Sequence, residues 1–137
     1  MVTEQTTRYT NKNVDLDRLS QQVVDYLNSE KFGTQKVKSA SGTVIEARKE
    51  NLLRDLITAD RCITILIQGQ PNDFKVTVGI GRWIQNLSVA AVEAALTAGL
   101  FLIVDIPQML WNHHIRDEIV QAINQMIEGK QVAEVTH

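Results

Sequence analysis

The sequence has almost no cysteine and no large excess of charge of either sign. Its single cysteine, Cys62, excludes a disulfide framework within the chain and a metal cluster held by thiolates alone. The formal net charge of −2 gives no indication of a nucleic-acid or polyanion partner. Because unpaired thiols are typical of reducing compartments, we expect a cytoplasmic protein.

We expect no targeting segment at the start of the sequence, and no internal repeat is recognisable in it. Residues 1–7 are polar and include an acid, Glu4, which is unlike a secretory signal peptide. A length of 137 residues fits one domain. We therefore expect a single domain over residues 1–129, followed by a mobile tail over residues 130–137.

No recognisable catalytic constellation is present. Cys62 has no local base, so we expect a packed structural thiol. The tripeptide Gly79-Ile80-Gly81 lacks the third glycine of a phosphate-binding turn, because Ile84 stands in its place. The adjacent pair His113-His114 would point about 100° apart on a helix and could not easily hold one metal ion. We expect no enzyme activity, no catalytic residue, no cofactor and no metal site.

Periodic apolar patterns are the main structural signal. Alternation predicts strands over residues 2–10, 34–40, 43–49, 61–69 and 74–80. Helical spacing predicts helices over residues 14–30, 87–104 and 105–128, with a short helical stretch over 50–58. Asn13 or Asp15 would cap the first helix, Lys31 and Gly33 would mark its end, and Gly129 would end the last helix.

Strands and helices are segregated along the chain, which indicates an α+β fold. In the strand over residues 43–49, Ile45 and Ala47 alternate with Glu46 and Arg48, as in an antiparallel sheet with one covered face. We therefore predict a twisted antiparallel sheet of about five strands, with an N-terminal helix and two C-terminal helices packed on one face.

The apolar run over residues 87–104 would have no polar face as a helix, so it would be buried on all sides or lie in a membrane. Its large apolar side chains would favour membrane insertion by about 4 kcal/mol, whereas Glu93 near its middle would cost about 3 kcal/mol. These two free energies nearly cancel, so the sequence does not favour a membrane span. We expect Glu93 at the rim of the helix, paired with an arginine such as Arg82 or Arg116.

One side of this helix carries a line of small residues, Ala91, Ala95 and Gly99. This four-residue spacing lets two helix backbones approach closely. Because a single sheet can cover only the other side, we expect these residues to form a homodimer interface, together with Trp111. A monomer in which the last helix covers the line of small residues is the alternative.

The expected function is therefore that of a non-enzymatic, soluble homo-oligomeric interaction protein whose C-terminal helices form the interface. Two alternatives stay open: a peripheral membrane-associated protein, and a module that binds a small apolar ligand between sheet and helix. The ligand cavity would be lined by Ile63, Ile65, Phe74, Val76, Leu96 and Leu100.

Three stretches of the sequence resemble a small family of uncharacterised bacterial proteins, cyanobacterial ones among them. They read Glu46-Ala47-Arg48-Lys49-Glu50, Pro71-Asn72-Asp73-Phe74 and Val78-Gly79-Ile80-Gly81-Arg82-Trp83. The resemblance covers roughly residues 14–86, and its motifs mark strands and turns. It implies no established activity.

Overall fold

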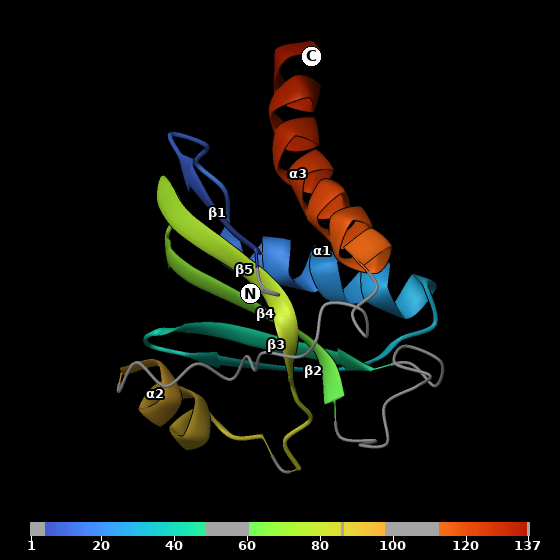
Figure 1. Cartoon of the computed structure of the whole chain (residues 1–137). Coiled ribbons are helices and arrows are strands. Elements are labelled where there is room, and N and C mark those ends of the chain that lie inside the picture. Colours follow the sequence, from blue (N-terminus) through green and yellow to red (C-terminus); the bar gives the residue numbers. More distant parts are fainter. Residues whose placement is uncertain (1–4, 49–60, 86, 98–112, 137) are drawn as a thin grey trace.

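The α+β class predicted from the sequence is confirmed by a computed structural model, which describes residues 5–48, 61–85, 87–97 and 113–136 (Figure 1). The elements are β1 (Gln5–Thr10), α1 (Leu16–Ser29), β2 (Gly33–Ser39), β3 (Gly42–Arg48), β4 (Arg61–Gln70), β5 (Asp73–Arg82), α2 (Val89–Thr97) and α3 (His113–Thr136). The helical stretch expected over residues 50–58 lies outside the described residues.

The five strands form one antiparallel sheet in the order β1-β5-β4-β3-β2. Strands β2 to β5 follow one another as neighbours, whereas β1, the first in the chain, pairs with β5. The N-terminal strand β1 therefore forms one edge of the sheet, and β2 forms the other. Strands β3 and β4 lie inside the sheet, where residues on either face can be buried.

Helices α1 and α3 cover the first face of the sheet (Figure 1). The amphipathic stripe predicted for α1 points into this core, as Leu19, Val23 and Leu27 are buried. The sheet and α3 contribute the remaining fully buried side chains, among them Ile45, Ile63, Ile65, Val78, Ile80, Ile119, Ile123 and Ile127. Burial of this apolar surface is the main source of stability on this face.

Helix α1 has well-formed caps at both ends. The Asp15 carboxylate accepts hydrogen bonds from the backbone N–H groups of Asp17 and Arg18, at 3.0 and 3.3 Å, which confirms one of the two predicted N-caps. At the other end, the Phe32 N–H donates to the Leu27 carbonyl at 3.0 Å, which is part of a Schellman motif.

The left-handed position of the Schellman motif that ends α1 is occupied by Lys31, with φ of 72°. The Lys31 N–H donates to the Asn28 carbonyl at 3.0 Å, which completes the motif. The predicted stop is confirmed, but the residue that takes the unusual backbone conformation is a lysine and not Gly33.

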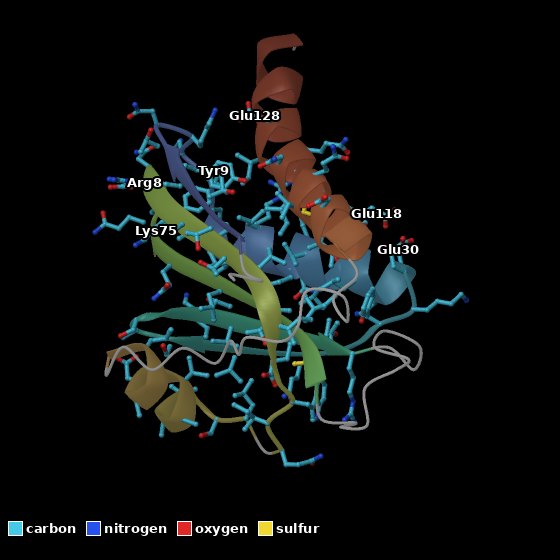
Figure 2. All side chains as sticks on the ribbon, viewed as in Figure 1. Arg8, Tyr9, Glu30, Lys75, Glu118 and Glu128 are labelled. Atoms are coloured by element: carbon cyan, nitrogen blue, oxygen red, sulfur yellow. The ribbon has the colours of Figure 1, made fainter. Side chains whose placement is uncertain are left out.

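Strand β1 ties α3 to the sheet. The Tyr9 hydroxyl hydrogen-bonds the Asn124 side chain, and its ring stacks on Phe74 with 5.1 Å between ring centroids. Lys12, just after β1, forms an ion pair of 2.8 Å with Glu128. Figure 2 shows Tyr9 pointing toward α3, whereas the neighbouring Arg8 points away from it.

Helix α3 differs from its prediction at its end. A stop was expected at Gly129, but the helix continues to Thr136, so residues 130–136 of the expected tail are helical. A single glycine costs a helix only about 1 kcal/mol, and the residues that follow Gly129 include lysine, glutamine and alanine, which are good helix formers. The predicted start at Asp105 lies outside the described residues.

Helix α2 is the one helix whose place differs from the prediction, because it packs on the second face of the sheet, opposite α1 and α3 (Figure 1). The reason lies in the two central strands. Val44 and Leu66 point to the second face, whereas their chain neighbours Ile45 and Ile65 point to the first. Apolar side chains on both sides of β3 and β4 require cover on both faces.

Candidate functional site

The second face of the sheet carries two neighbouring rows of side chains under and beside α2. One row is apolar and consists of Val37, Val44 and Leu66. The next row is polar and consists of Gln35, Glu46 and Thr64. Buried polar side chains require hydrogen-bond partners. The polar row therefore marks the part of this face where specific hydrogen bonds act in addition to packing.

The polar row holds the connection between β5 and α2. The Ile84 N–H donates to Glu46 Oε1 at 3.0 Å, and the Ile84 carbonyl accepts from Gln35 Nε2 at 3.0 Å. Gln35 Nε2 also donates to Glu46 Oε1 at 2.6 Å. We call these three residues the Ile84 clamp. It carries the chain from β5 across the sheet toward β2 and β3, where α2 begins.

A cation–π contact holds the same connection one residue earlier. The Arg48 guanidinium lies 4.1 Å from the centre of a Trp83 ring. Such contacts stabilise exposed sites by about 0.5–1 kcal/mol. Arg48 is the last residue of β3 and follows Glu46 by two positions, so strand β3 contacts both Trp83 and Ile84.

Glu46 is the most unusual residue of the polar row, because its side chain is fully buried at 0% relative exposure. The two hydrogen bonds that Glu46 accepts in the clamp both reach Oε1, whereas Oε2 accepts none from the described residues. Burial raises the pKa of Glu46, and the hydrogen bonds from Ile84 and Gln35, together with the nearby Cys62 thiol, lower it by less. Glu46 also forms no ion pair within the described part of the chain.

Cys62 belongs to the adjacent strand β4. It lies near Glu46 of β3 and is also fully buried. Its Sγ atom is 3.6 Å from Thr64 Oγ1. Burial, assisted by the Glu46 carboxyl group, raises the pKa of the thiol to about 12. A thiol with this pKa is protonated at neutral pH and is a poor nucleophile. The geometry therefore agrees with the expected packed structural thiol.

Helix α2 sits on the apolar row through a small cluster of side chains. Val92 is fully buried against Val44 and Leu66, and Leu87 and Leu96 pack around them. The inward-facing residues follow the helical spacing of four from Val92 to Leu96. This cluster is much smaller than the core on the first face, so fewer apolar contacts hold α2.

Glu93 fastens α2 to the turn between β2 and β3. The Ser41 hydroxyl donates to Glu93 Oε1 at 2.6 Å, and the Ser41 N–H donates to Oε2 at 3.0 Å. These bonds, with the Ser41 hydroxyl as the largest cause, lower the pKa of Glu93. The residue lies half-buried at the rim of the helix. Its expected arginine partners, Arg82 and Arg116, have side chains outside the described part of the structure.

The outward face of α2 is formed by small apolar residues. Ala90 and Ala91 are exposed, and Val89 has 57% relative exposure. Of the four predicted interface residues, Ala91 therefore lies on the surface. The Ala95 side chain is not among those described, and Gly99 and Trp111 lie outside the described residues.

The six residues predicted to line an apolar ligand cavity do not come together. Ile63, Ile65, Phe74 and Val76 belong to the core of the first face, which α1 and α3 fill. Leu96 packs on the second face with Val44 and Leu66. The prediction was wrong because it placed every helix on one face; Leu100 lies outside the described residues.

A polar groove of about 690 Å³ lies at the start of α1, between the β2–β3 and β4–β5 turns. Its lining includes Asp15, Asp17, Lys38, Ser39, Gly42, Gln70 and Pro71. Asp15 already caps α1, and Asp17 forms an ion pair of 2.9 Å with Lys38. The charged groups of the groove therefore serve the fold.

Sequence reasoning missed Glu46 as a buried group, because strand alternation placed it on a face expected to be solvated. The signal that could have revealed it is Val44, an apolar residue on the same side of the same strand.

The described side chains contain no cluster of three or more His, Cys, Asp or Glu residues suited to a metal ion. Nor does any helix within the described ranges have the length and apolar character needed to cross a membrane.

Comparison of the chain with protein-family models, with curated proteins and with solved structures finds no match. The function must therefore be argued from the second face of the sheet and from α2.

Proposed function

We propose that this protein is a non-enzymatic interaction protein that self-associates through the outward face of α2. The observation that carries the proposal is that α2 is apolar on both sides. Val92 is buried against the sheet, whereas Val89, Ala90 and Ala91 face solvent. A helix without a polar face normally has both sides covered.

The size of these side chains favours a second helix as the cover. Alanine side chains let helix backbones approach closely, and the same surface on a second copy would be self-complementary about a twofold axis. Most soluble homo-oligomers have this symmetry. We also propose a cytoplasmic location, since the single cysteine is a buried free thiol.

The test is the molar mass of the protein in solution, measured by sedimentation equilibrium at micromolar concentration. We expect a dimer for the natural sequence and a monomer for Ala91→Glu, because the substitution would place a charge in the apolar contact. Gln22→Glu is the matched control, as it adds the same charge to an exposed position of α1 and should leave the dimer intact. A monomeric natural protein, or an Ala91→Glu variant that remains dimeric, would contradict the proposal.

A further inference from the structure

The connection from β5 to α2 depends on a carboxyl group that is buried without a partner charge. Glu46 Oε1 accepts from both Gln35 and Ile84, whereas Oε2 accepts from no described residue. Full burial of an ionised carboxylate without a balancing charge is unfavourable. Protonation of the carboxyl group removes this charge, so burial favours the neutral acid.

The charged and titratable groups around Glu46 can be named for each described element of this face. On β3, Arg48 holds its guanidinium against Trp83. On β4, Cys62 carries a protonated thiol. Strand β2 presents the uncharged Gln35, and Glu93 of α2 is bound at the hairpin turn by Ser41. None of these described groups forms an ion pair with Glu46.

We propose that Glu46 is a proton-dependent latch, whose neutral form holds Ile84 and helix α2 against the sheet and whose ionisation releases α2. Loss of the proton leaves a buried negative charge that water must reach. Of the two residues that donate hydrogen bonds to the carboxyl group, Gln35 belongs to strand β2, whereas Ile84 belongs to the connection that leads to α2. Lifting the Ile84 connection therefore solvates the charge without disrupting the strands.

The small contact beneath α2 makes local release feasible. Val44, Leu66 and Val92 are the fully buried members of its cluster, whereas the first face carries a continuous core from two helices and the sheet. Elements with few buried apolar contacts open at lower free energy than the rest of a domain. The latch acts within one chain, so it does not rest on self-association, although release of α2 would also move the proposed interface.

The direct test is a carbon-13 NMR titration of the Glu46 carboxyl group in the natural protein, combined with hydrogen exchange of the α2 amides as a function of pH. We expect Glu46 to titrate above the ordinary range for glutamate. Between the ordinary glutamate pKa and this raised pKa, the protection factors of the α2 amides should fall by up to about tenfold per pH unit, and they should level off at higher pH. Amides of β4 and β5 should keep theirs.

Titration of Glu46 at or below the ordinary glutamate pKa would overturn the latch. So would an equal loss of protection in β4 and β5, because that result would mean global destabilisation. The variant Glu46→Gln retains an acceptor oxygen for Ile84 and cannot ionise, so its α2 protection should not change with pH. Glu93→Gln, which alters the other carboxyl group at α2, should retain the pH dependence that the natural protein shows above the ordinary glutamate pKa. If Glu46→Gln does not fold, the carboxyl titration and exchange of the natural protein decide the matter.

Discussion

The first face of the sheet is covered by two helices, α1 and α3, whereas the described cover of the second face is the short helix α2. Apolar side chains fill the first face from both helices and from the strands beneath. The second face joins a small apolar cluster to a row of polar side chains that includes a buried carboxyl group. One face is thus organised mainly by apolar packing, and the other by a smaller apolar cluster together with hydrogen bonds to a buried carboxyl group.

The comparison shows how one sheet can combine a stable scaffold with an element that is held conditionally. Packing of apolar surface changes little with pH, whereas a buried titratable group links the stability of its contacts to proton binding. The second face holds both Glu46 and the attachment of α2, so any regulated movement is expected there.

The largest difference should appear between two neighbouring residues of β4 that point to opposite faces. Ile65→Ala opens a cavity in the main core and should lower the free energy of unfolding by about 3–5 kcal/mol. Leu66→Ala affects the smaller cluster, which can relax, and should cost about 2–3 kcal/mol. Both side chains are fully buried, so they form a matched pair. Denaturant unfolding measures both, and an equal or larger loss for Leu66→Ala would contradict the comparison.

Gly42 offers a second way to disturb the second face, through the hairpin turn that α2 contacts. Its φ is +152°, and a Cβ atom there would lie 2.9 Å from Gln68 Cγ and 3.3 Å from Leu96 Cδ1. Gly42→Ala should therefore destabilise the protein by about 1–3 kcal/mol, measured by denaturant unfolding.

Gly33→Ala is the control for this glycine, because a Cβ atom at Gly33 would meet only the Arg48 carbonyl, at 3.8 Å. Its stability should stay close to that of the natural protein. Similar losses for the two alanine variants would show that steric crowding at Gly42 is not the cause.

Glu46 should make stability depend on pH in a definite direction. Burial raises the pKa of the folded carboxyl group above its unfolded value. The neutral form therefore favours folding below the ordinary glutamate pKa, and this contribution is lost as the pH rises through the raised pKa. Between the two pKa values, the stability of the natural protein relative to Glu46→Gln should fall by about 1.4 kcal/mol per pH unit. Parallel pH profiles of unfolding for the two proteins would exclude this effect.

A smaller effect is expected at the end of α1, on the first face. Lys31 adopts a left-handed backbone conformation, which costs an L-residue about 1–2 kcal/mol relative to glycine. Lys31→Gly should therefore raise the free energy of unfolding by about 1 kcal/mol, after the greater freedom of glycine in the unfolded chain is subtracted. Lys31→Ala serves as the control and should give no such gain.

The smallest effect should come from Glu93. Its pKa is lowered by the Ser41 hydrogen bonds, so its contribution is present above the ordinary glutamate pKa and is lost as the pH falls through the lowered value. In Glu93→Gln, exchange of the α2 amides should become slightly faster at neutral pH, and the difference from the natural protein should vanish in acid. A difference that persists at low pH would point to a contact other than this carboxylate.

Much of the fold follows from local patterns in the sequence. The stripe from Leu19 to Leu27 predicts the buried side of α1, and the alternation in β5 predicts its inward residues. These patterns suffice because periodicity reports directly on burial.

The site depends on contacts between distant parts of the chain, which periodicity does not report. Glu46 and Ile84 are 38 residues apart, and Ser41 and Glu93 are 52 residues apart. Gln35 and Glu46 read as solvated strand residues until the connection to α2 is known to cross above them. The continuation of α3 beyond Gly129 was missed because a weak local signal was given too much weight.

Hydrogen exchange of the natural protein, measured at one pH between acidic and neutral, compares the attachment of α2 with that of α1. We expect amides in the middle of α2 to open at a lower free energy than those of α1, because fewer buried contacts hold α2 to the sheet. Protection of α2 equal to that of α1 would contradict this expectation, since the two faces would then be held with equal strength.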